Sequence, residues 1–208
     1  MEAASVTEPS LSGDKAALST DKAERIVEAM RASVATRGFA ASTFEQVARA
    51  AGVSRGLLHY YFGTKERLLV EAVRRECDLR HEQIDRAIVG ANSADDVLAA
   101  LVQAFEQFLG EGPSPAVMFF EVLTLAQRNE EIAAQLADLG RRMRGHIAEA
   151  LRAKAAAGVL ELRADADTAA TFLLALADGI TIRLMSEPDL DVGPLMAQSV
   201  AAARALLG

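Results

Sequence analysis

Arg55, His59 and Tyr60 bring a guanidinium, an imidazole and a phenol group together within one short segment. On the outward side of a helix, these groups can hydrogen-bond to the edges of stacked base pairs. Gly56 has no side chain, so the backbone of that helix can come close to a nucleic acid. Lys65 lies in the first turn of the next predicted helix, where a cation opposes the helix dipole. A phosphate oxygen held by the Lys65 ammonium and the helix N-terminus would explain this placement.

Two short helices joined by a tight turn are predicted to position these groups. Thr43 caps the first helix, Gly52 allows a left-handed turn without a Cβ penalty, and Ser54 caps the second helix. The buried faces follow from apolar residues at helical spacing: Phe44, Val47, Ala48 and Ala51 in the first helix, and Leu58 and Phe62 in the second. Read from spacing alone, an ordinary helical corner with its polar side chains in water remains an alternative.

The segment from residue 43 to residue 69 resembles the TetR-like transcriptional regulators. The residues that carry the resemblance are Thr43, Val47, Ala48, Ala51, Gly52, Val53, Ser54, Gly56, Leu58, Tyr61, Phe62, Lys65, Leu68 and Leu69. The resemblance is strong over residues 20–75, and the form LLHYYFGTK is similar to a subgroup that includes choline-responsive regulators, although it does not identify the ligand. The resemblance to the TetR-like regulators implies that the helix from Arg55 to Phe62 is the recognition helix and that Thr43, Tyr61 and Lys65 contact phosphates.

The expected DNA-binding residues are therefore Thr43, Ser54, Arg55, Gly56, His59, Tyr60, Tyr61 and Lys65. The family also implies that the C-terminal two-thirds of the chain binds a small molecule.

Composition limits the class of protein. The chain has 208 residues, is 51% hydrophobic and carries a net charge of −7. Residues 20–75 nevertheless hold ten Lys and Arg against six Asp and Glu, which modestly supports a basic module on an acidic body. No run of 18 uninterrupted apolar residues and no signal-peptide core is found, so we expect a cytoplasmic protein without a membrane partner. The single cysteine, Cys77, is expected to be a buried structural thiol.

Helical periodicity predicts an all-α fold of about nine helices without strands. Residues 1–18 read as a disordered tail, residues 19–66 as a helix-turn-helix DNA-binding domain, and residues 67–208 as a ligand-binding and dimerisation domain. Asp21 with Glu24 is expected to cap a first helix that stops at Gly38. A long helix from Thr64 to about Gly90 is the natural lever between the two domains.

The last two predicted helices, at about residues 167–186 and 192–207, are apolar on more than one face and fit a four-helix interface across a two-fold axis. The alternative is a central helix buried inside one protomer. Asp178 and Arg183 are expected to form an ion pair across the dimer. The expected interface residues are Phe172, Leu176, Ile180, Arg183, Leu184, Met196, Val200 and Ala203.

No catalytic or metal-binding spacing is recognised, and no cofactor is expected. The three histidines look scattered, and His81 with Asp85 reads as a solvated contact on one helix. Glu121 interrupts an apolar helix, where a cationic or hydrogen-bonding ligand, a neighbouring arginine or simple exposure could compensate its carboxylate. The expected ligand-binding residues are Phe105, Phe108, Met118, Phe120, Glu121, Leu139, Met143 and Phe172.

These features favour a homodimeric repressor released from a palindromic double-stranded DNA operator by an unknown small-molecule effector. Its two recognition helices would enter successive major grooves about 34–36 Å apart. An activator, or a regulator that needs its ligand to bind DNA, would use the same parts. The competing classes are an all-α enzyme built around Glu121 and His146, and a small-molecule-binding dimer without a DNA role.

Overall fold

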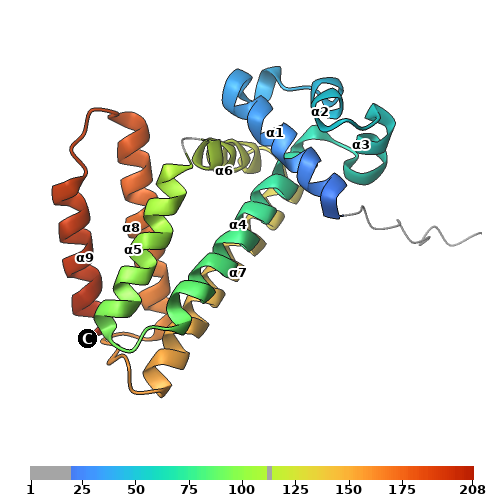
Figure 1. Ribbon diagram of the computed structural model, residues 1–208. Helices are drawn as coiled ribbons and strands as arrows, with labels where there is room; N and C mark the ends of the chain where they lie inside the picture. Colours follow the sequence, from blue (N-terminus) through green and yellow to red (C-terminus); the bar gives the residue numbers. More distant parts are fainter. Residues whose placement is uncertain (1–19, 112–113) are drawn as a thin grey trace, which may run out of the picture.

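The computed structural model describes residues 20–111 and 114–208, so the predicted tail at residues 1–18 lies outside the described residues. Within the described ranges the chain forms nine helices and no strand, as the all-α prediction required (Figure 1). They are α1 (Thr20–Ala41), α2 (Phe44–Ala51), α3 (Arg55–Phe62), α4 (Lys65–Val89), α5 (Ala94–Gly110), α6 (Ser114–Ala126), α7 (Glu130–Ala156), α8 (Ala166–Ser186) and α9 (Gly193–Leu207).

The N-terminal helices α1, α2 and α3 gather at one end of the molecule, and the long helices α4 and α7 lie side by side and run away from them (Figure 1). Helix α6 contacts both long helices and α1. Helices α8 and α9 lie on the far side, where α8 packs on α7 and α9 packs on α5. Because α4 begins at the N-terminal helices and runs to the opposite end of the body, it joins the two parts as predicted (Figure 1).

Helix α1 differs from its prediction at its start, and it is interrupted at Gly38, where the first helix was predicted to stop. It begins at Thr20, which puts Asp21 inside the first turn instead of at the cap, and it continues past Gly38 to Ala41. Gly38 has a φ of 74° and kinks the helix there. The Ser42 hydroxyl donates to the Gly38 carbonyl at 2.9 Å and accepts from the Ser33 hydroxyl at 2.8 Å, so side-chain bonds brace the kink.

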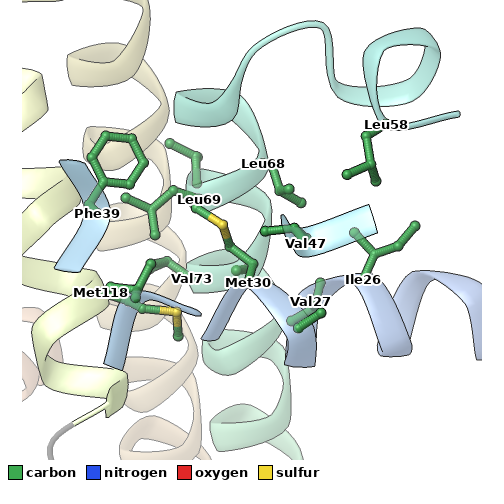
Figure 2. Packing of buried hydrophobic residues seen from close by; sticks show 14 of the residues in the cluster. Ile26, Val27, Met30, Phe39, Val47, Leu58, Leu68, Leu69, Val73 and Met118 are labelled. Carbon is green, nitrogen blue, oxygen red and sulfur yellow. The ribbon is translucent and has the colours of Figure 1, made fainter. Parts of the chain in front are cut away.

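One apolar core joins the N-terminal helices to the start of α4 and to α6. Ile26, Met30 and Val47 are completely buried beside Leu68 and Leu69 of α4 (Figure 2). Phe39, which follows the α1 kink, is only 7% exposed and closes this core. The core also takes in Met118 and Leu139, which come from α6 and α7. The N-terminal unit is therefore packed against the body through a shared apolar core.

A second apolar core holds the body together. It is built from buried residues of α4, α5, α7, α8 and α9, with Val97, Ala148, Leu151, Ala169 and Leu207 at its centre. Two backbone bonds, from Glu161 to Leu207 and from Arg163 to Leu206, tie the end of α9 to the segment after α7. The Lys154 ammonium donates to the carbonyls of Val89 and Ala91, which fixes the end of α4 on α7.

Candidate nucleic-acid interface and ligand pocket

The turn between α2 and α3 has the predicted geometry. The Thr43 hydroxyl accepts from the Gln46 amide, and the Gln46 side chain accepts from the Thr43 amide, which forms a complete capping box. Gly52 adopts a left-handed conformation with φ 65°, and its N–H donates back to the end of α2. The Ser54 hydroxyl accepts from the Leu57 amide and caps α3. Local bonds therefore fix the angle between the two helices.

Helix α3 buries Leu58 and turns its polar side outward. Arg55, Gly56 and His59 are exposed, and Tyr60 is 55% exposed. The Arg55 guanidinium donates to His59 Nε2 at 3.3 Å, and His59 Nδ1 lies 3.4 Å from the Gly63 carbonyl. This arrangement fits the tautomer in which Nδ1 carries the proton. The Tyr61 ring lies edge-on to the Tyr60 ring, with centroids 5.0 Å apart.

Lys65 makes bonds inside the protein that the sequence did not predict. Its ammonium donates to the Phe39 carbonyl at 2.8 Å and to the Ala40 carbonyl at 3.3 Å, and it lies 4.2 Å from the centroid of the Phe39 ring. These contacts fasten the start of α4 to the end of α1. An ammonium has three N–H donors, so one donor is left for a phosphate.

The body encloses a pocket of about 340 Å³ between α4, α5, α6, α7, α8 and α9. Its wall is mainly apolar, and four of its residues are phenylalanines: Phe105, Phe108, Phe119 and Phe120. Apolar walls with a few polar groups are typical of small-molecule sites. The arrangement can bind a largely apolar molecule and shield it from water.

Half of the predicted ligand residues lie elsewhere. Phe105, Phe108, Phe120 and Met143 line the pocket, whereas Met118 and Leu139 are buried in the first core. Phe172 is 39% exposed on the outer face of α8, and Glu121 is half-buried on α6 without lining the pocket. Helical periodicity identified Met118 and Leu139 as buried, but it could not say which of two cores they join.

Sequence reasoning missed the polar groups of the pocket. Glu76 and Arg80 of α4 line it, as does Asp178 of α8, which also reaches solvent. Burial raises the pKa of the Glu76 carboxyl despite nearby arginines, and burial also raises the pKa of Asp178. Cys77 lines the pocket beside Glu76, and burial raises the pKa of its thiol to about 11. The i, i+4 spacing of Glu76 and Arg80 around an apolar cysteine was the available signal.

The outer face of α8 is apolar and exposed, but not all predicted interface residues lie on it. Phe172, Ile182 and Met185 are 39–41% exposed there. Ile180 and Ala203 are instead buried in the protomer, and Leu176, Met196 and Val200 line the pocket. Leu184 is half-buried, and Arg183 is exposed and pairs at 3.1 Å with Glu187, the residue that follows α8. Among the described helices, α8 alone is long and apolar enough to cross a membrane by length and composition.

The histidines are not scattered as the sequence indicated. His81 of α4 stacks on His146 of α7 with ring centroids 4.3 Å apart. His146 Nε2 lies 3.0 Å from the Asp85 carboxylate, so Asp85 pairs with His146 and also acts electrostatically on His81 of its own helix. Burial, and then the charge of His146, lowers the pKa of His81.

A glycine turn that presents an exposed polar helix, attached to a helical body with an apolar pocket, defines a helix-turn-helix DNA-binding protein with a small-molecule site. Comparisons with known proteins agree. The model described as "Bacterial regulatory proteins, tetR family" matches residues 26–72. The model described as "BetI-type transcriptional repressor, C-terminal" matches residues 94–208. The chain therefore belongs to the tetR family of transcriptional regulators, with a C-terminal part of the BetI type.

Relatives and solved structures support this assignment. The HTH-type transcriptional regulator BetI of Rhizobium meliloti is 30% identical over 76% of this chain and 75% of its own length. A TetR-family regulator from Rhodococcus sp. has the same fold, with a TM-score of 0.77 at 23% identity over 91% of this chain and 100% of its own. A regulator from Saccharomonospora viridis, solved in complex with choline, has a TM-score of 0.68 at 25% identity, covering 90% of this chain and 95% of its own.

Proposed function

We propose that this protein is a homodimeric repressor that leaves a palindromic operator when a small molecule enters the pocket formed by the six helices α4 to α9. The observation that carries the proposal is the exposed face of α3. Arg55 and Tyr60 project outward from a helix whose angle is fixed by the caps at Thr43 and Ser54 and by the Gly52 turn. Such a helix fits the major groove, where Arg and Tyr side chains can contact base edges.

Phosphate contacts would set the position of α3 on DNA. We assign them to Thr43, Tyr61 and the remaining donor of Lys65, which lie around the ends of α2, α3 and α4. Ser54 and Gly56 allow the backbone at the start of α3 to approach the duplex. His59 accepts a hydrogen bond from Arg55 and so holds its guanidinium in place. Phosphate contacts position a protein without reading sequence, so specificity is assigned to Arg55 and Tyr60.

A second copy of the chain is the proposed partner of the exposed faces of α8 and α9. Phe172, Ile182 and Met185 of α8 and Leu195 of α9 leave an apolar surface open to solvent. Because the exposed side of α8 also carries Asp178 and Arg183, a protein partner suits it better than lipid. Two copies related by a two-fold axis would present two α3 helices to the two halves of a palindrome.

The effector is proposed to have a mainly apolar body, which the phenylalanine-rich wall would bury. A cationic group facing Asp178 would compensate the desolvation of that carboxyl group, whose pKa is raised. The choline complex of the Saccharomonospora viridis regulator makes choline a reasonable first probe.

We assign the protein to the cytoplasm, with a DNA-binding domain at residues 19–66 and an effector and dimerisation domain at residues 67–208, and without enzymatic activity.

Selection from a random library of double-stranded DNA tests this function. We expect enrichment of a two-fold symmetric sequence whose half-sites are about one helical turn apart. An all-α enzyme or a small-molecule carrier would enrich no sequence, even at low salt where phosphate contacts are strongest. Among the described interactions, His146 contacts His81 and Asp85, and none joins it to Glu121, so the enzyme alternative lacks its expected pair.

A further inference from the structure

Four alternating charges join the N-terminal helices to the pocket wall. Arg31 of α1 lies 3.3 Å from Glu76 of α4 and 3.3 Å from Glu111, which follows α5. Arg80 of α4 lies 3.5 Å from Glu76 and 3.0 Å from the same Glu111 carboxylate. The four side chains therefore form a closed ring of ion pairs that joins α1, α4 and the residue that follows α5.

The ring is shielded from water more than ordinary surface pairs are. The side chains of Glu76 and Arg80 are 12% and 11% exposed, and those of Arg31 and Glu111 are 21% and 31% exposed. Charges held in such surroundings interact more strongly than charges on an open surface, and removing one leaves its partners uncompensated. A change in the geometry of one ion pair therefore alters the interactions of the other pairs in the ring.

One side of the ring belongs to the pocket. Glu76 and Arg80 line the pocket, and the Arg80 guanidinium lies 4.8 Å from the centroid of the Phe108 ring, which lines it too. A molecule in this pocket that contacts the Phe108 side chain can shift its aromatic ring and the Arg80 guanidinium above it. Such a shift would alter the Arg80–Glu111 contact, and Arg31 pairs with the same carboxylate.

We propose that the ring of Arg31, Glu76, Arg80 and Glu111 is the relay that transmits pocket occupancy to the DNA-binding helices. This inference rests on the proposed function. Occupancy breaks or shifts the contacts of Arg80, Arg31 loses its hold on Glu111, and α1 changes its position relative to α4. The relay supplies the differential contacts that coupling between two sites requires.

Cys77 allows the pocket to be filled without knowing the effector. It is the only cysteine of the chain and lines the pocket next to Glu76. Benzyl methanethiosulfonate would attach a benzylthio group to its sulfur as a disulfide, with methanesulfinate leaving. Because the thiol pKa is about 11, labelling needs alkaline buffer and a mass-spectrometric check. Cys77→Phe is a second, permanent way of filling the same space.

The measurement is the ratio of operator Kd after and before filling, with the DNA taken from the library selection. In the wild-type background we expect labelling or Cys77→Phe to weaken binding roughly 5- to 150-fold. In Arg31→Met and in Glu111→Gln the ratio should fall below about 2. Arg74→Met is the matched control, because the ion pairs of Arg74 within the described residues are with Glu71 and Asp78 of its own helix, and it should keep the wild-type ratio.

The possible failures are distinguishable. If Arg31→Met and Glu111→Gln respond to filling as the wild type does, the relay is wrong while the proposed function stands. If filling the pocket leaves the wild-type operator Kd unchanged, the pocket is not coupled to DNA binding. The relay and the proposed release of the operator by a small molecule then both fail. An equal loss of the ratio in Arg74→Met also overturns the relay, because the effect would then not depend on the four residues of the ring.

Discussion

Lys65 combines two demands in one side chain. Its bonds to the Phe39 and Ala40 carbonyls hold α4 against α1, and its remaining donor is assigned to a DNA phosphate. The sequence predicted only the second role, because a bond to carbonyls after the α1 kink depends on the folded path of the chain. A purely structural lysine and a phosphate-binding lysine differ in one measurable quantity, the salt dependence of DNA binding.

For Lys65→Met we expect weaker binding to all DNA sequences alike and a salt slope flatter by about one unit. The variant should also be less stable, since two carbonyls lose their charged donor. Fluorescence anisotropy at several salt concentrations provides the slope. A lower affinity with an unchanged slope would show that Lys65 acts only by holding α4 in place.

Gly52 is required by its backbone conformation and not by lack of space. Its φ is 65°, and a Cβ there would only touch the end of the Arg25 side chain at 3.6 Å. Gly52→Ala should therefore destabilise the protein by about 1–2 kcal/mol. Gly145→Ala is the control, because Gly145 lies inside α7 with open space around it and alanine favours helix by up to about 1 kcal/mol. Urea denaturation would rank the two, and equal effects would contradict the argument.

Helix ends were predictable because their signals are local. The predicted caps at Thr43 and Ser54 bind the amide three residues ahead, and Thr64, Ser93 and Asn129 cap their helices in the same way. The pocket was only half predictable, because α6 contributes both to the first core and to the pocket wall, α7 contributes to both cores, and periodicity does not tell these surroundings apart. The contact between His81 and His146 was not predictable at all, since it depends on the register of α4 against α7.

That contact makes stability depend on pH. The pKa of His81 lies below its usual value of 6.5, because burial and the charge of His146 oppose protonation more than Asp78 and Asp85 favour it. Arg142 of α7 opposes it as well. The unfolded chain then binds more protons than the folded chain below pH 6.5, so the unfolding free energy falls as the pH drops through this region.

His81→Phe should reduce this dependence, because phenylalanine keeps a flat ring against His146 and has no proton to gain. Urea denaturation at pH 7.5 and at pH 5.5 measures the difference for both proteins. An equal loss of stability in the variant and the wild type would assign the pH dependence to other groups.

The N-terminal unit carries an excess of basic residues, whereas the rest of the chain is acidic. The net charge of −7 would repel DNA if it were evenly spread, yet residues 20–75 carry more basic than acidic side chains. The acidic body then disfavours wrong orientations on DNA while the α3 face approaches it. Two such units are needed to read a palindrome, so the proposed function requires a dimer that forms through the exposed face of α8.

Ile182→Lys tests that face, because it would place two like charges near the two-fold axis of the proposed dimer. We expect dissociation into monomers in analytical ultracentrifugation, together with a large loss of operator affinity. Leu123→Lys is the control: Leu123 is 40% exposed against 39% for Ile182, but it lies on α6, away from α8 and α9. A dimer that survives Ile182→Lys would place the interface elsewhere.

The central claim is that the outward side of α3 reads base pairs, and repeating the library selection with Arg55→Ala and Tyr60→Ala tests it most directly. The account predicts that each variant still binds DNA but loses its preference at one symmetric pair of positions, one in each half-site. Base preferences identical to those of the wild type in both variants would contradict the account, because DNA would then be read by another surface.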